Sequence, residues 1–111
     1  MLNGALRILA VDPANQTGWA YVDADGRRLY GSWAIAKHGD SHPGDRLMRF
    51  RDGLLEFLAV HPAELIACED SHFGSRNHET AAMHAELRGV LKLLAREHGA
   101  RYVAYKPNTI K

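Results

Sequence analysis

Residues 5–36 read ALRILAVDPANQTGWAYVDADGRRLYGSWAIA, and this stretch predicts the first half of the fold. Residues 5–12 are a short apolar run rich in Ile, Leu and Val, with the length of a buried strand. Residues 18–36 alternate on both sides of Asp25-Gly26, a dipeptide typical of hairpin turns because those turns need positive φ. We therefore predict three antiparallel strands between residues 6 and 36.

The period of the apolar residues changes after residue 40. Residues 40–62 place apolar side chains on one face of a helix, between Pro43 and His61-Pro62. Residues 64–70 then predict a short strand, residues 77–98 a helix that begins at Asn77 and stops at Gly99, and residues 101–105 a last strand. The order predicts an α/β fold, a mixed five-stranded sheet with helices covering its faces.

Composition sets the class of protein. The chain has 111 residues, which is the size of one domain, and its net charge of +1 does not by itself indicate a nucleic-acid ligand. Its single cysteine, Cys68, excludes an intramolecular disulfide and a multi-cysteine zinc site. Residues 1–11 lack the features of a signal peptide, and no apolar run approaches the ~20 residues of a membrane span. We expect a cytoplasmic protein with no membrane partner.

An acidic residue stands at the end of two predicted strands, Asp12 after the first and Glu69 after the fourth. If these strands are parallel neighbours, both carboxylates meet at one edge of the sheet, where ligands bind in open α/β sheets. Two close carboxylates repel unless a proton or a cation lies between them, and oxygen ligands suit Mg²⁺. The alternative is structural, because an aspartate at a strand end is most often a cap or a turn former.

Three motifs carry a family resemblance. The segment ILAVDPANQTGWAYVD resembles the first motif of the RuvC-like Holliday junction resolvases, and LIACEDSHFGSRN followed by ELRGVLKLLAREHG resembles the second. The segment YVAYKPNTIK resembles the stretch that leads from strand five to a lysine of the last catalytic region. The match keeps the family's order over almost the whole chain. It implies an RNase H-like fold, a homodimer, and cleavage of four-way DNA junctions with Mg²⁺ or Mn²⁺, two ions per site.

The resemblance also assigns roles by position. Asp12 and Glu69 match two metal-binding acids of the family, and Lys111 matches a basic residue that contacts phosphate at the catalytic site. The family has two further acids on a final helix, and this chain ends before them. We therefore expect residues 1–111 to be a single RNase H-like nuclease domain whose last catalytic helix is missing from the chain.

The same resemblance points to DNA contacts. The family presents an aromatic residue to the junction centre from the loop after Glu69, and because this loop is one residue longer here, that position falls on Phe73 or His72. Arg76 and Lys106 are further DNA-binding candidates beside Lys111. Basic residues of the two helices could line a phosphate track, although a solvated helix face is the simpler explanation for each of them (Arg46, Arg49, Arg51, Arg88, Lys92 and Arg96).

The favoured interpretation is a structure-selective, metal-dependent endonuclease of recombination and repair that nicks four-way junctions in pairs. The main alternative is a catalytically silent junction-binding or nucleic-acid-binding module of the same fold. A third is an RNase H-like nuclease that acts on RNA–DNA hybrids or flaps. Acids on a helix after Lys111 would distinguish the first from the second, and both a bacterial and a phage source fit.

Overall fold

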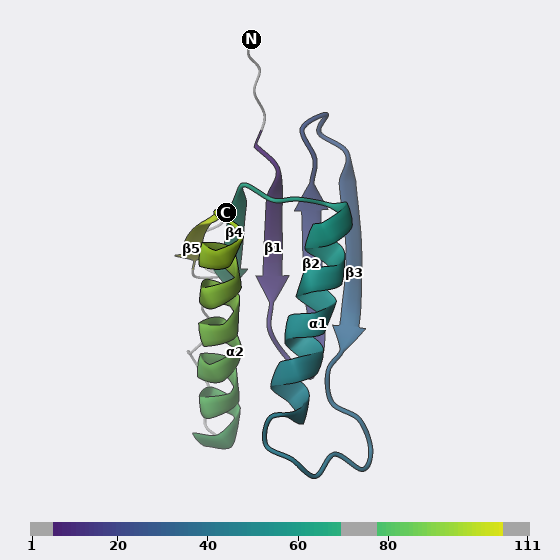
Figure 1. The fold of residues 1–111 in the computed structure, drawn as a ribbon, viewed down its shortest axis with the longest axis vertical. Coiled ribbons are helices and arrows are strands. Elements are labelled where there is room, and N and C mark those ends of the chain that lie inside the picture. The colour runs from purple at the N-terminus through teal and green to yellow at the C-terminus, as the bar shows by residue number, and fades with distance from the viewer. Residues whose placement is uncertain (1–5, 70–77, 106–111) are drawn as a thin grey trace.

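The computed structural model describes residues 6–69 and 78–105, which form a five-stranded sheet and two helices (Figure 1). In chain order the elements are β1 (Ile8–Asp12), β2 (Gln16–Val22), β3 (Arg28–Ala34), α1 (Asp45–Val60), β4 (Leu65–Glu69), α2 (His78–Glu97) and β5 (Arg101–Tyr105). This order confirms the prediction from the sequence, and the strands follow one another across the sheet as β3-β2-β1-β4-β5.

The central strand, β1, joins an antiparallel half of the sheet to a parallel half. It pairs with β2, and β2 pairs with β3, both in the antiparallel sense that the alternating pattern predicts. On its other side β1 pairs in parallel with β4, and β4 pairs in parallel with β5. The strands β1, β4 and β5 therefore bring their carboxyl ends to the same edge of the sheet.

The turn between β2 and β3 forms at the predicted Asp25-Gly26 position. The Gly26 N–H donates to the Asp23 carbonyl at 3.0 Å, and the Asp23 N–H donates to the Arg27 carbonyl at 3.0 Å. Gly26 has a φ of +84°, whereas Asp25 does not have positive φ. The connection is therefore a turn followed by a glycine bulge, which is the next commonest hairpin after the two-residue turn.

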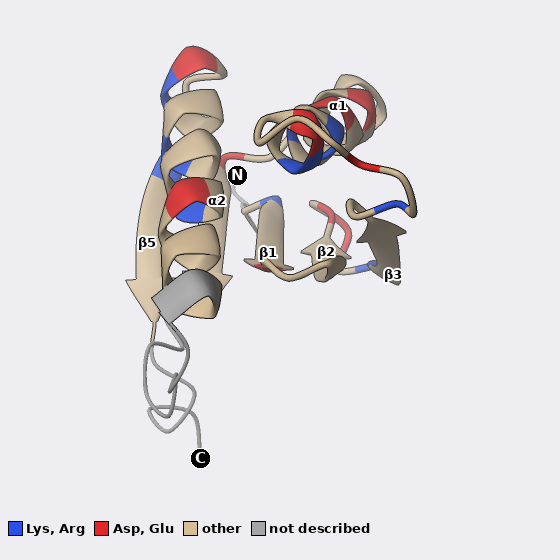
Figure 2. Ribbon diagram, turned by 90° about the horizontal axis from the view of Figure 1, so that it is seen from below, with Lys and Arg blue, Asp and Glu red and all other residues tan. Residues whose placement is uncertain are grey.

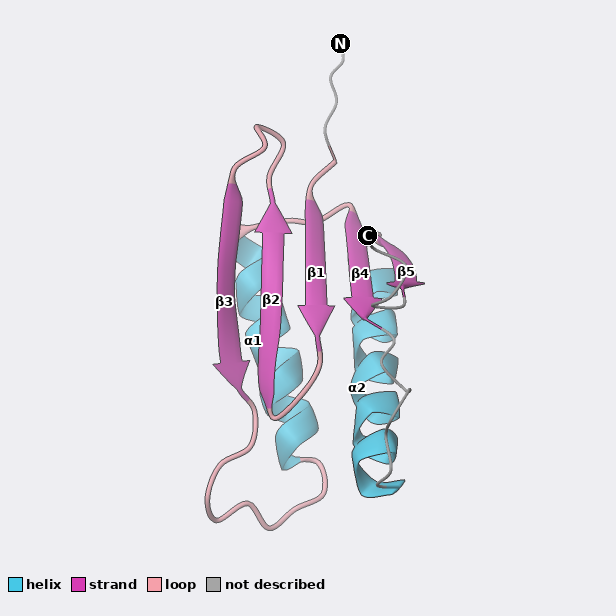
Figure 3. Ribbon diagram, turned by 180° about the vertical axis from the view of Figure 1, so that it is seen from behind, coloured by secondary structure: helices cyan, strands magenta, loops and turns pink. Residues whose placement is uncertain are grey.

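Both helices lie on the same face of the sheet. Figure 2 views the layers end-on, and Figure 3 shows all five strands in front of α1 and α2. The chain passes from β3 through α1 to β4, and then through α2 to β5, always moving away from β3. Crossovers share one hand, so two crossovers in one direction place their helices on one side. No described element covers the opposite face.

The hydrophobic core lies between the helices and the sheet. The helices contribute the side chains that their 3.6-residue period predicts, and the buried ones include Phe50 and Leu54 of α1 and Leu87 and Leu91 of α2. The sheet contributes alternate residues of its inner strands, all of them at most 2% exposed: Leu9, Val11, Tyr21, Ile66 and Cys68. Residues between these, and those that end β1 and β4, face the side without helices.

Aromatic rings cover the antiparallel half of the sheet beneath α1. The ring centroid of Trp19 lies 4.6 Å from that of Phe57 and 6.1 Å from that of Trp33. Trp19 pairs with Gly31 across β2 and β3, and its indole lies directly over the Gly31 backbone. A Cβ atom at Gly31 would lie 2.7 Å from Trp19 Cε2 and 2.9 Å from Nε1, so this packing requires glycine.

The described residues of this part of the chain begin at the start of α2 and end with β5. Gly99, with a φ of +70°, ends α2 as predicted. The proposed helix cap, Asn77, and the helix start expected after Pro107 lie outside the described residues.

Candidate active site

Two acidic side chains stand at neighbouring strand ends. The parallel pairing of β1 with β4 ends with Val11 beside Cys68, so Asp12 and Glu69 follow it at the same level. Val11 and Cys68 are buried beneath the helices, and the alternation of the strands turns the two acids to the face without helices. Asp12 is exposed and Glu69 is half-buried. The structure thus provides the juxtaposition that the strand-end prediction requires.

A third side chain, Tyr105, stands beside them. β5 pairs Tyr105 with Glu69, so the phenol stands on the same face and at the same edge as the two carboxylates. The sequence prediction did not include Tyr105, because a tyrosine that ends a short strand is typical of any sheet. Its position in the fold would have indicated it, because Tyr105 is the last residue of the third parallel strand.

The electrostatics of the three groups confirm that they lie within reach of one another. Burial raises the pKa of Glu69 above its usual value, and the negative charge of Asp12 raises it further. Burial also raises the pKa of the Tyr105 phenol, and the charges of Glu69 and Asp12 act in the same direction. This edge of the sheet therefore holds excess negative charge that a cation would relieve.

The loop from β1 to β2 is fixed by its own residues. Thr17 is completely buried, and its hydroxyl donates to the Ala14 carbonyl at 2.7 Å and accepts from the Ala14 N–H at 3.4 Å. The Asn15 carbonyl accepts the N–H of Ile35 at 2.9 Å, which ties the loop to the end of β3. The loop that follows Asp12 is thus held at two points.

The acids suit a divalent cation, although the pair alone does not complete a site. Paired carboxylate oxygens are the donors that Mg²⁺ and Mn²⁺ prefer. In the described part of the chain no group of three or more His, Cys, Asp and Glu side chains comes together. Asp12 and Glu69 would hold such an ion together with further ligands. The other predicted site residues lie outside the described ranges: His72, Phe73, Arg76, Lys106 and Lys111.

Comparison with known proteins identifies the relatives of the chain. The family model described as crossover junction endodeoxyribonuclease RuvC matches residues 8–111. A curated protein of that name from Rhodopseudomonas palustris is 36% identical over 110 residues, covering 96% of this chain and 62% of the relative. Another from Rhodopirellula baltica is 33% identical over 108 residues, covering 94% and 60%. The chain thus spans somewhat less than two thirds of the length of these relatives.

Solved structures show the same fold. Thermus thermophilus RuvC in complex with a Holliday junction substrate aligns with a TM-score of 0.76 and 22% identity, covering 93% of this chain and 64% of that one. The yeast mitochondrial Holliday junction resolvase Ydc2 aligns with a TM-score of 0.58 and 13% identity. The RNase H-like α/β fold is therefore confirmed. Among the described residues, neither helix has the length and apolar character of a membrane span.

Proposed function

The chain belongs to the family of the crossover junction endodeoxyribonuclease RuvC, and we propose that it forms a single nuclease domain that cuts four-way DNA junctions. The observation that carries this proposal is the placement of Asp12 and Glu69 at adjacent parallel strand ends, where burial and mutual repulsion favour a bound cation. We place its action in the cytoplasm of a bacterial cell, and the bacterial sources of its relatives support this.

The proposed cofactor is Mg²⁺ or Mn²⁺, with two ions per site. When bound, such ions stabilise negative charge on the oxygens of a phosphodiester. The chain's own contribution is to hold the carboxylates of Asp12 and Glu69 at one level on rigid strands, so that little reorganisation is needed on binding. The hydroxyl of Tyr105, at the same edge as Glu69, would help to orient water held by such an ion. In the relatives the protein extends further, and we propose that acids from that part complete the ligand set.

The remaining site residues are proposed from the family resemblance. Lys111 contacts the phosphate at the site, and Arg76 and Lys106 contact the backbone nearby. Phe73 or His72 reaches the junction centre from the loop after Glu69. Alanine substitution of Phe73 and of His72, one at a time, distinguishes the last two, because loss of the aromatic residue that reaches the junction centre should reduce cleavage more strongly.

We also propose a homodimer, and the structure offers a surface for it. A groove of about 430 Å³ runs between α1 and α2 and has a mostly apolar lining, with Arg51 and Glu97 among its polar residues. Met48 and Leu93 in this groove are 54% and 59% exposed, an unusual position for large apolar side chains. A second copy turned by a two-fold axis would cover them and could pair each Arg51 with the partner's glutamate.

Light scattering coupled to gel filtration tests the dimer. Leu93→Glu should convert dimers to monomers, whereas Val60→Glu, which places the same charge on an exposed residue of α1 outside the groove, should not. A monomeric wild-type protein, or equal effects of both variants, would contradict this surface.

The decisive experiment for the function is cleavage of a labelled synthetic four-way junction in Mg²⁺ or Mn²⁺, with a linear duplex of the same sequence as control. Residues 1–111 are compared with a chimera that adds the remaining part of the R. palustris relative. Asp12→Asn should abolish cutting. Asp52 is an exposed acid whose partner among the described residues is its neighbour Arg51, so Asp52→Asn should leave cutting unchanged.

The outcomes separate the candidate functions. Paired nicks in the junction and not in the duplex, lost in Asp12→Asn, would support the resolvase. Cutting by the chimera alone would show that the acid pair needs partners from the added part. Junction binding without cutting in either form and with either metal would favour the silent binding module. No preference for the junction would refute both.

A further inference from the structure

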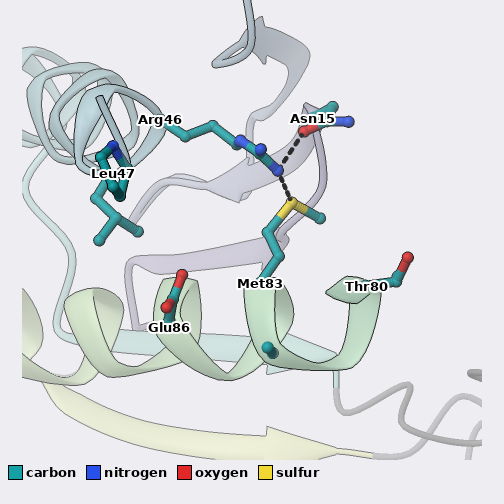
Figure 4. Close-up of a pocket in the computed structure, with 8 residues that line it drawn as sticks. Asn15, Arg46, Leu47, Thr80, Met83 and Glu86 are labelled. Carbon is teal, nitrogen blue, oxygen red and sulfur yellow. Dashed lines mark hydrogen bonds between the residues drawn. The ribbon is translucent and has the colours of Figure 1, made fainter. Parts of the chain in front are cut away.

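A cavity of about 640 Å³ opens between the first turns of α1 and α2 and the loop from β1 to β2 (Figure 4). Its lining comes from the loop, from the segment that leads into α1, and from both helices: Asn15, Pro43, Arg46, Leu47, Thr80, Ala82, Met83 and Glu86. Asn15 lies three residues after Asp12, so the loop that begins at Asp12 forms part of the cavity wall on the helix side of the sheet, whereas the two acids face the other side. Its volume falls in the range of about 300–1,000 Å³ that is usual for ligand sites.

Arg46 reaches across this cavity and is held there by uncharged groups. Its Nη1 donates to Asn15 Oδ1 at 3.3 Å and also contacts the thioether sulfur of Met83. Figure 4 shows the guanidinium between these two side chains, with Thr80 on the facing turn of α2. The hydrogen bonds recorded for Arg46 use Nη1, whereas an arginine carries five N–H donors in a planar fork.

The other two arginines of α1 form ion pairs with carboxylates. Arg49 forms a two-pronged ion pair with Asp40 and also donates to the Ile35 carbonyl. Arg51 pairs with Asp52 at 3.0 Å. Among the side chains that the structure describes, those of residues 6–69 and 80–105, no carboxylate oxygen lies within 4.0 Å of the Arg46 guanidinium. Of the three arginines that the sequence places on this helix, Arg46 is thus the one whose charge remains available to a ligand.

We propose that Arg46, oriented by Asn15, binds a backbone phosphate of the DNA strand that enters the Asp12–Glu69 site. This inference rests on the proposed function, and it adds a phosphate subsite formed by α1 and the loop after β1. Planar guanidinium groups bind phosphate through two parallel hydrogen bonds, and helix-borne groups fix the register of a strand without reading its sequence. The amide nitrogen of Asn15 and the hydroxyl of Thr80 add uncharged donors on the same cavity wall.

The cavity also contains one acid, Glu86, which restricts where the phosphate sits. Glu86 lies six residues after Thr80 on α2, which is about 9 Å along the helix axis. Repulsion by this carboxylate favours the end of the cavity near Asn15 and Thr80. That end is also the one formed by the loop after Asp12, so the phosphate would lie on the path of a strand that passes this loop on its way to the acids.

The test is binding of a labelled four-way junction by anisotropy, over about 50 to 200 mM salt, in the Asp12→Asn background so that nothing is cut. Arg46→Gln should weaken binding about tenfold and reduce the slope of log K against log salt by about 1. Arg46→Lys should restore the slope, because it restores the charge. Arg96→Gln removes one charge from the far end of α2 and should change affinity less than about twofold.

Three results would overturn the inference. The first is an Arg46→Gln variant whose slope of log K against log salt is unchanged. If the melting temperature of this variant also falls, Arg46 is a structural link between α1 and α2. The second is an equal effect of Arg96→Gln. The third is failure of the Asp12→Asn protein itself to bind the junction, which would remove the proposed function together with its subsite. If the Asp12→Asn protein binds the junction normally and Arg46→Gln leaves the salt dependence unchanged, the phosphate subsite alone is refuted and the proposed function stands.

Discussion

Replacing Gly31 with alanine should destabilise the fold because of a single close approach. The added Cβ would lie 2.7 Å from Trp19 Cε2, whereas carbon atoms in contact are normally about 3.5–4.0 Å apart. The indole cannot withdraw by about 1 Å without disturbing its contact with Phe57, whose ring centroid is 4.6 Å away. Overpacking of this kind costs about 1–3 kcal/mol, and the entropic benefit of losing a strand glycine offsets about 0.5–1 kcal/mol.

We therefore expect Gly31→Ala to lower the free energy of unfolding by about 1–2 kcal/mol. In urea denaturation this corresponds to a midpoint lower by about 1 M with an unchanged slope. Gly18→Ala is the matched control: Gly18 lies in β2, lacks positive φ, and a Cβ there would meet nothing within 4 Å. This control should be neutral or slightly stabilising.

A double-mutant cycle tests the cause. In a Trp19→Leu background the obstructing indole is gone, so Gly31→Ala should cost little. The same cost in both backgrounds, or an equal loss in Gly18→Ala, would refute the reasoning.

Three further predictions follow from the site and its surroundings. Glu69→Gln should raise the melting temperature in EDTA near neutral pH, because it removes the repulsion between Glu69 and Asp12. Added Mg²⁺ should then raise the melting temperature of the wild type but not that of the variant. A lower melting temperature of the variant in EDTA would contradict repulsion between the two acids. The hydrogen bond from Arg49 is the main reason that the pKa of Asp40 falls from 3.8 to about 2. The ion pair therefore stabilises the fold above about pH 4, and this stabilisation is lost as the pH falls towards 2. Urea denaturation should accordingly show Asp40→Asn to be less stable than the wild type near neutral pH and equally stable at about pH 2, and a constant difference would contradict the assignment. Tyr105→Phe should change the free energy of unfolding by less than about 1 kcal/mol. It should raise the Mg²⁺ concentration needed for cleavage about tenfold, as measured by metal titration. An unchanged metal requirement would show that Tyr105 is not part of the site.

Local patterns in the sequence were sufficient for the elements of the fold. The alternation around Asp25-Gly26 predicts β2 and β3 because both strands and their turn depend on neighbouring residues. The apolar period that includes Phe50 and Leu54 predicts α1 for the same reason. The position of both helices on one face could not be predicted in this way, because it depends on the direction in which the two crossovers cross the sheet.

The candidate site shows the same division. Asp12 and Glu69 were predicted because a charge at the end of an apolar strand is visible in the sequence. Tyr105 was missed because its significance depends on the register between β4 and β5. Arg46 and Arg49 were equivalent in the sequence, and only the fold brings Asp40 to one of them and Asn15 to the other.

The parallel pairing of β1 with β4 has a consequence for the timing of folding. Arg7 and Glu64, which join the two strands by a backbone-to-carboxylate hydrogen bond of 2.9 Å, are 57 residues apart in the chain. The antiparallel strands β1, β2 and β3 need only short loop closures, whereas the acid pair assembles only after the long connection through α1 has closed. A nascent or partly folded chain therefore contains both carboxylates before they form a pair.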